Sequence, residues 1–344
     1  MRSSRPPRHG AIPGGGASRV LAAFAVLVAT SLSASSAAAQ QPAQGFDLER
    51  LYTSAPGGGW FVMDSLDMHG KLGGAVNTLV SYARNPLRIT DGTQHLALVS
   101  DEAFLQLGFA VTYDRYRLYF SFDSPLTVQG DSGTVGGYTF TAPSIDPSSS
   151  PDAISHARFG FDARILGDAT SAFRLGLGAQ LWVPGGAPGA LRSNYLSDGP
   201  PSSSLGSYNA MARVLFAGDV GFITYAGHLG LHLRQLNESD VPGNPQGSEA
   251  LFGAAAGAKI SICEACDKRL VVGPEVFGAT ALRSALDTNT TALEGLLTGR
   301  LEGTADDRPQ LRFKLGIGGG LNPHFGAPEG RVVIGIELFE NNAK

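Results

Sequence analysis

The sequence is poor in charged residues, in cysteine and in long apolar runs. Only 16% of the 344 residues are Asp, Glu, Lys or Arg, and the formal net charge is -4. This composition excludes a basic nucleic-acid-binding protein. The one long apolar run, Val20 to Leu32, is shorter than the roughly 20 residues that a membrane-spanning helix needs. A helical membrane protein is therefore excluded as well.

The first residues have the pattern of an export signal. Met1 to Arg19 contains four arginines and no acidic residue, an apolar run follows, and Ala37 to Ala39 is the small-residue pattern that a signal peptidase accepts. A membrane anchor is the alternative, which the short apolar run disfavours. No cysteine follows Ala39, which argues against a lipid-modified N-terminus. The sequence predicts a signal peptide over residues 1–39 and an exported mature chain.

The rest of the chain alternates apolar and polar residues in one stretch after another. From Phe173 to Leu181, for example, each second residue is apolar and the residues between are Arg, Gly or Gln. A period of two indicates β-strands with one apolar face. Twelve strands are predicted: Leu72–Ala83, Val99–Tyr113, Tyr116–Asp123, Ser155–Leu166, Ala172–Val183, Ser207–Ala217, Gly221–Arg234, Ala250–Ile262, Lys268–Leu282, Thr290–Glu302, Gln310–Gly320 and Arg331–Phe339.

The connections between these strands alternate in length. The short ones are Asp114–Arg115, Gly167–Ser171, Gly218–Val220, Cys263–Asp267 and Gly303–Pro309, and the long ones are Ser124–Ile154, Pro184–Gly206 and Gln235–Glu249. A soluble β-sandwich has no reason to sort its connections in this way. In bacterial outer-membrane barrels, short turns face the periplasm and long loops face outward. The predicted fold is an all-β, antiparallel, up-and-down transmembrane barrel of about twelve strands.

The alternation also predicts which side chains face the lipid. The outward set includes Tyr116, Leu118, Phe120 and Phe122, then Ala157, Phe159, Phe161, Ala163 and Ile165, then Tyr208, Ala210, Ala212, Val214 and Phe216. The charged residues have the opposite parity, as expected if lipid excludes them. The candidate pore-lining residues are Arg117, Arg158, Asp162, Arg164, Arg174, Arg213, Arg234, Lys259, Arg269, Glu275, Glu294, Arg300, Arg312 and Lys314, and Asp123, Glu302, Arg331 and Glu337 share their parity.

Basic residues exceed acidic ones about two to one on this inward face. A water-filled lumen of this kind would favour anions. The alternative is a narrow lumen filled by arginine–carboxylate pairs, because an unpaired charge away from water is strongly disfavoured. Twelve strands lie between barrels that side chains fill and barrels that are open, so the strand number does not decide.

Residues 40–71 do not alternate cleanly. Trp60 to Met63 is apolar, and the segment is either a periplasmic extension of the first strand or a plug at the barrel mouth. Aromatic residues gather at the membrane interface in barrels, so the favoured interpretation of Trp60 is a girdle residue. We predict a periplasmic or mouth-lining role for this segment.

Cys263 and Cys266 form a C-E-A-C pattern in a predicted periplasmic turn. A thioredoxin-like motif would need a βαβ context, and a zinc site would need two more ligands nearby. The favoured interpretation is a disulfide that closes the turn in an oxidising compartment.

The sequence predicts no catalytic, metal or cofactor site. A lipase at the membrane surface would need Ser and His together on the lipid face. His156, His228 and His232 all have inward parity. The glycine clusters Gly57–Gly59 and Gly318–Gly320 lack the lysine and the strand-to-helix context of a phosphate-binding loop. We expect no enzyme activity.

Several stretches also suggest a family. Phe46 to Gly70, FDLERLYTSAPGGGWFVMDSLDMHG, is followed by LGGAVNTLVSYARNPL and then by LVSDEAFLQLGFAVTYDRYRLYFSFDSPL. These stretches resemble the N-terminal barrel region of outer-membrane protein A family proteins of myxobacteria, most specifically before Pro125. The resemblance implies an outer-membrane barrel. Members commonly continue into a domain that binds peptidoglycan, which has no counterpart in this chain, so cell-wall tethering is not implied.

Four regions are thus predicted: a signal peptide (1–39), the N-terminal segment (40–71), the barrel (72–340) and a C-terminal tail (341–344). The predicted location is the bacterial outer membrane. The predicted partners are outer-membrane lipid, lipopolysaccharide, the barrel-assembly machinery and small solutes, with no nucleic acid and no cofactor. The predicted function is a passive channel or transporter for small solutes, anions included. The alternative is a structural or surface-binding barrel whose long loops contact a partner.

Overall fold

The computed structural model describes residues 49–90, 92–93, 95–135, 138–140, 142, 156–184, 209–234, 247–263, 267–288, 290–303, 309–322 and 326–340. Of residues 138–140, 156, 184, 234 and 263, only the backbone is described. All these residues belong to one compact unit, Pro42–Lys344. The predicted signal peptide and the predicted C-terminal tail lie outside the described residues.

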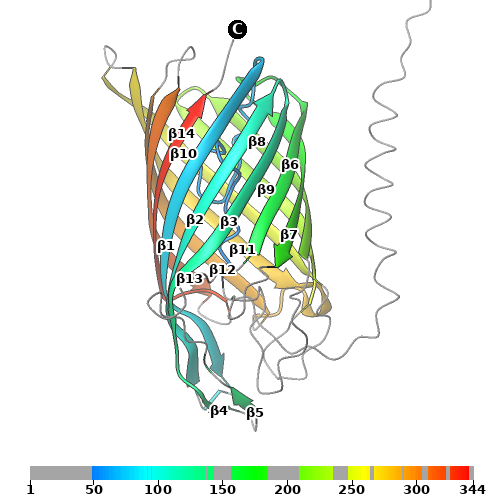
Figure 1. Ribbon diagram of the computed structural model, residues 1–344, viewed down its shortest axis with the longest axis vertical. Coiled ribbons are helices and arrows are strands. Elements are labelled where there is room, and N and C mark those ends of the chain that lie inside the picture. The colour runs from blue at the N-terminus through cyan, green and yellow to red at the C-terminus, as the bar shows by residue number, and fades with distance from the viewer. Residues whose placement is uncertain are drawn as a thin grey trace, which may run out of the picture. The chain divides into compact units, whose positions relative to one another are not determined.

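Twelve antiparallel strands form a closed barrel (Figure 1). Neighbours along the chain pair with each other, and β1 pairs with β14 to close the sheet. The prediction of an all-β, up-and-down, twelve-stranded barrel is therefore confirmed. The barrel strands are β1 (Leu72–Thr90), β2 (His95–Tyr113), β3 (Tyr116–Gln129), β6 (His156–Leu166), β7 (Arg174–Pro184), β8 (Asn209–Val220), β9 (Ile223–Arg234), β10 (Glu249–Cys263), β11 (Lys268–Ala281), β12 (Thr291–Gly303), β13 (Gln310–Asn322) and β14 (Gly330–Glu340).

The first three strands are longer than predicted and continue past the barrel. The hairpin of β4 (Gly133–Val135) and β5 (Tyr138–Phe140) follows β3 and lies at their far end (Figure 1). Here a small apolar cluster forms, with Leu98, Val99 and Val128 fully buried. The predicted loop Ser124–Ile154 therefore begins as strand, because its apolar residues are buried against those of β1 and β2.

The two ends of the barrel differ. At one end the strands are joined by the two-residue turns Asp114–Arg115 and Gly221–Phe222, and β1 begins and β14 ends there. The second turn was predicted at Gly218–Val220, but β8 continues to Val220 and Gly221 takes the left-handed φ of +59°. We call this the short-turn end. The three longest connections, 130–155, 185–208 and 235–248, join strands at the opposite end, which we call the loop end.

The outer surface of the barrel is apolar. The large side chains of the predicted outward parity are exposed, among them Leu118 (63% exposed), Phe159 (48%) and Val214 (42%). Their inward neighbours Arg117, Arg158 and Arg213 are buried. Only a hydrocarbon environment matches such a surface, so the fold is that of a transmembrane β-barrel. Among the residues that the structure describes, no helix is long and apolar enough to cross a bilayer.

This outward face gives a first prediction. Leu297 lies at the middle of β12 with 61% of its surface exposed, whereas Leu72, at 64%, is the first residue of β1. We expect Leu297→Arg to lower the free energy of unfolding by about 2–4 kcal/mol, and Leu72→Arg by about 0–1 kcal/mol, because the cost depends on depth in the bilayer. Urea titration in lipid vesicles measures both. Equal losses at the two positions would contradict a bilayer around the barrel.

Candidate functional site: the segment inside the barrel

Residues 49–71 run through the interior of the barrel from the loop end to the short-turn end (Figure 1). At the loop end, Arg50 Nη2 donates to Glu249 Oε1, at the start of β10, over 2.7 Å. At the short-turn end, the Asp114 N–H donates to the Gly70 carbonyl over 2.9 Å. We call residues 49–71 the luminal segment.

This position differs from the periplasmic or mouth-lining role predicted for residues 40–71. Trp60 is 0% exposed and lies inside the barrel, so it is not a girdle residue at the membrane interface. The physical reason is that the inward face is partly apolar. Leu79, Leu215 and Val333 have inward parity and pack in one buried cluster with the luminal segment. These inward apolar residues were the sequence signal for a plug, and the parity argument overlooked them.

The apolar residues of the luminal segment fit the wall closely at glycines. A Cβ at Gly316 would lie 2.8 Å from the Phe61 ring, and a Cβ at Gly253 would lie 2.2 Å from Met63 Cε. A larger residue at Gly316 would force the Phe61 ring to shift, whereas at Gly253 the end of the flexible Met63 side chain could move aside. The wall therefore has notches that match particular side chains of the segment.

Asp64 holds the middle of the luminal segment by charge. Arg117 Nη2 bridges Asp64 and Asp162 of β6, and Arg213 Nη1 lies 3.2 Å from Asp64 Oδ2. Arg213 Nη2 also lies 3.2 Å from Asp162 Oδ1, so two arginines and two aspartates alternate. Tyr119 lies beside these four residues, and its hydroxyl accepts hydrogen bonds from Arg213 (3.1 Å) and from Gln180 (2.6 Å). We call Asp64, Arg117, Asp162 and Arg213 the Asp64 cluster.

The Asp64 cluster is electrically balanced and shut off from water. Its four side chains are at most 2% exposed. Each of the two arginines lies within 3.2 Å of both aspartates, so the four charges compensate one another. The luminal segment is therefore bound to the wall through Asp64, which Arg117 of β3 and Arg213 of β8 both contact.

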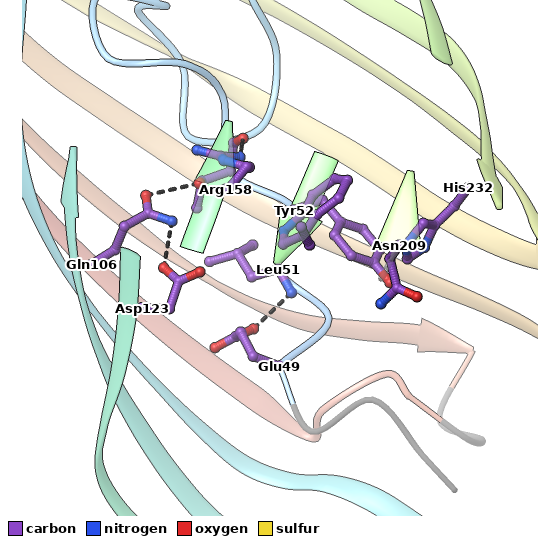
Figure 2. A pocket seen from close by; sticks show the side chains of 10 residues that line it. Glu49, Leu51, Tyr52, Gln106, Asp123, Arg158, Asn209 and His232 are labelled. Atoms are coloured by element: carbon purple, nitrogen blue, oxygen red, sulfur yellow. Dashed lines mark hydrogen bonds between the residues drawn. The ribbon is translucent and has the colours of Figure 1, made fainter. Parts of the chain in front are cut away.

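At the loop end, the luminal segment leaves only small spaces. Figure 2 shows Tyr52 with the wall residues Asn209 and His232 on one side and the Gln106–Asp123 hydrogen bond (2.6 Å) on the other. The cavity there measures about 20 Å³, and a second one, lined by Tyr52 and Phe277, about 30 Å³. Each has room for one or two water molecules. Neither of these two cavities is large enough to pass a solute.

The structure buries eleven of the fourteen candidate pore residues, with their side chains on the inward face: Arg117, Arg158, Asp162, Arg164, Arg174, Arg213, Glu275, Glu294, Arg300, Arg312 and Lys314. Lys259 and Arg269 are half-buried. The side chain of Arg234 lies outside the described residues. Each of the thirteen described side chains contacts the luminal segment or a partner on the wall, and their role in a pore stays a prediction.

The charge balance of the wall also differs from the prediction. Among the described strands, nine basic and eight acidic side chains are buried, against the predicted two-to-one excess. The predicted inward set omits two of these buried acids, Glu102 and Glu249, and the half-buried Asp219. Glu249 and Asp219 had been assigned to connections, and Glu102 shares the parity of Gln106 but had not been counted. Asp219 accepts hydrogen bonds from Arg174 (2.8 Å) and Lys259 (3.0 Å), so the wall pairs many of its own charges.

Other predicted features fall partly outside the described residues. Cys266 and the side chain of Cys263 lie outside the described part of the chain, so the predicted disulfide stays a prediction. His228 and His232 are buried inside the barrel, 5% and 1% exposed. Within the described ranges, no group of three or more His, Cys, Asp or Glu could hold a metal ion.

Solved structures with a similar fold are outer-membrane barrels. An outer membrane channel from Pseudomonas putida F1 is 12% identical with a TM-score of 0.44, over 79% of this chain and 95% of that one. The toluene transporter TbuX of Ralstonia pickettii is 10% identical with a TM-score of 0.40, over 88% and 96%. The CymD monoaromatic hydrocarbon channel is 9% identical with a TM-score of 0.37, over 81% and 90%. No protein-family model and no curated protein matches the chain. Similarities of this size assign no function to this chain.

Proposed function

We propose that the protein is an outer-membrane channel for small solutes that its own luminal segment holds closed. The observation that carries this proposal is the luminal segment itself, which runs through the barrel and is bound there by buried charges. Displacement of the segment would leave a lumen lined by ionised groups, which is the lining of a water-filled channel.

The apolar belt and the sorted connections support an outer-membrane location. With the short turns in the periplasm, the loop end faces the outside, in contact with lipopolysaccharide. Lipid contacts the belt, and the barrel-assembly machinery would read β14 during insertion. The resemblance to the myxobacterial outer-membrane protein A family agrees with this location.

The proposed solutes are small and include anions. The luminal segment brings Glu49 and Asp64 to the wall, where they neutralise Arg331, Arg117 and Arg213. When the segment leaves, these arginines face water with fewer acidic partners. The open lumen then has a modest basic excess and attracts anions.

Planar-bilayer recording tests the proposal. We expect the wild-type protein to stay closed most of the time and a variant without residues 50–70 to conduct steadily, with a preference for anions that Arg174→Gln and Arg213→Gln together weaken. Heat modifiability on a gel shows whether the deletion variant is folded. If the deletion variant does not fold, the full-length Gly316→Val protein is recorded in its place. In that protein the valine side chain occupies the space of the Phe61 ring and forces the ring to shift. A folded but silent variant would contradict the channel.

A structural or surface-binding barrel is the second candidate function. It is favoured by the extension of β1, β2 and β3 beyond the barrel, where Leu87, Ile89 and Phe104 are buried with the β4–β5 hairpin. Such a projection at the loop end presents a built surface to the outside. Silence of the folded Gly316→Val protein in the same recordings would favour this function.

A further inference from the structure

The wall recognises the backbone of the luminal segment at several places. The Glu275 carboxylate accepts from the N–H groups of Phe61 (3.0 Å) and Val62 (2.9 Å). Glu275 is 0% exposed, and Thr298 Oγ1 also donates to it over 2.7 Å. The Glu337 carboxylate similarly accepts from the Gly57 N–H. Wall carboxylates therefore satisfy backbone donors that have no strand partner.

Arginine side chains of the wall donate hydrogen bonds to backbone carbonyl groups of the luminal segment in the same way. Arg164 Nη1 donates to the carbonyls of Leu66 (3.0 Å) and Met68 (2.6 Å). Arg158 donates to the carbonyls of Thr53 and Ser54. Both arginines are buried, at 5% and 2% exposure. The wall thus contacts the main chain of the segment at several places. The segment also folds on itself, because the Ser54 N–H donates to the Phe61 carbonyl (2.8 Å) and the Ser65 N–H to the Gly58 carbonyl (2.9 Å).

The side chains of the segment add selectivity at its centre. Trp60 packs under Arg300, whose guanidinium carbon lies 4.7 Å from the ring centroid, and Lys314 Nζ lies 5.3 Å from the Phe61 ring. The notches at Gly316 and Gly253 receive Phe61 and Met63. Main-chain hydrogen bonds, together with pockets for individual side chains, are a general means by which proteins bind peptides.

From these contacts we infer that the lumen is a binding site for a short polypeptide that folds on itself as residues 49–71 do, and that these residues are the resident occupant. The ligand class is a chain with a run of large apolar residues followed by an acid, as in Trp60 to Asp64. This inference rests on the proposed function in one respect, because the resident segment must be able to leave. It goes beyond that function by naming a polypeptide, supplied separately, as a ligand of the lumen.

The test uses the full-length protein, folded first and then cut. A protease site introduced at Gly70, at the short-turn end, allows the luminal segment to be separated from β1 after folding. A fluorescent synthetic peptide of residues 49–70 is then added in excess, and fluorescence polarisation measures its binding. We expect the labelled peptide to replace the resident fragment and to remain bound after dilution. This measurement does not depend on conductance, so a silent barrel would contradict the channel without affecting the result.

Matched variants test the recognition of the backbone. Glu275→Gln should weaken peptide binding at least tenfold, because a neutral amide replaces the carboxylate that accepts two N–H groups. Glu329→Gln, on the exposed connection before β14, should leave binding unchanged. A peptide methylated on the Phe61 and Val62 nitrogens should also bind at least tenfold more weakly, and one with serine at Trp60, Phe61 and Met63 at least a hundredfold.

Several results would overturn the inference. In the first, the resident fragment leaves the cut barrel but no labelled peptide enters. In the second, the fragment never leaves, which makes it a permanent part of the barrel core. In the third, the N-methylated or serine-containing peptide binds as tightly as the native sequence, which means that the wall does not read the chain in the way described.

Discussion

Replacement of Asp64 by asparagine is expected to open the barrel. Asp64 is the one carboxylate of the luminal segment in the Asp64 cluster, and its loss leaves Arg117 and Arg213 with Asp162 alone. Removal of one partner from a buried ion pair costs about 3–5 kcal/mol, because the remaining charge stays buried. With the segment displaced, both arginines are hydrated and that cost disappears. The closed state alone is therefore destabilised.

The expected size of this effect is large. At 1.4 kcal/mol for each factor of ten, a loss of about 3–5 kcal/mol raises the ratio of open to closed barrels by roughly a hundredfold to a few thousandfold. Single-channel recording of the full-length protein gives the open fraction directly. Asp67→Asn is the matched control, because Asp67 lies three residues further along the same segment but is half-buried. A folded Asp64→Asn protein that is as closed as the wild type would refute the role of the Asp64 cluster.

Removal of β14 is expected to abolish the barrel altogether. This strand forms eleven residue pairs with β1 and nine with β13, and it closes the sheet. Without it, two strand edges would face hydrocarbon, where each unpaired backbone group costs several kcal/mol. No single side-chain substitution in the wall has a comparable consequence.

Heat modifiability on a gel measures this result. A chain that ends at Glu329 should migrate identically with and without boiling, since no folded barrel resists the detergent. A chain that lacks only residues 341–344 should still shift between a folded and an unfolded position, because β14 ends at Glu340. A shift in the shorter chain would mean that β14 is not the closing strand.

The sequence alone was sufficient for the architecture. A two-residue period has only one structural interpretation, so all twelve strands were placed within a few residues, except where β1, β2 and β3 extend past the barrel. The extension of β3 was missed because its first residues, Ser124 and Pro125, open the stretch Ser124–Ile154, which is rich in Ser, Pro and Gly and therefore reads as a loop. The parity of residues such as Leu118 and Arg117 followed from the same period, because successive side chains of a strand point to opposite faces.

The contents of the barrel were decided by tertiary structure. Parity shows that Arg117, Asp162 and Glu275 point inward. It does not show which residue each of these side chains contacts inside the barrel. Their partners lie far away in the sequence: Asp64 is 53 residues from Arg117, and Phe61 is 214 residues from Glu275. Periodicity fixes direction within one strand, whereas the pairing of buried charges with a segment depends on how all twelve strands curve around it.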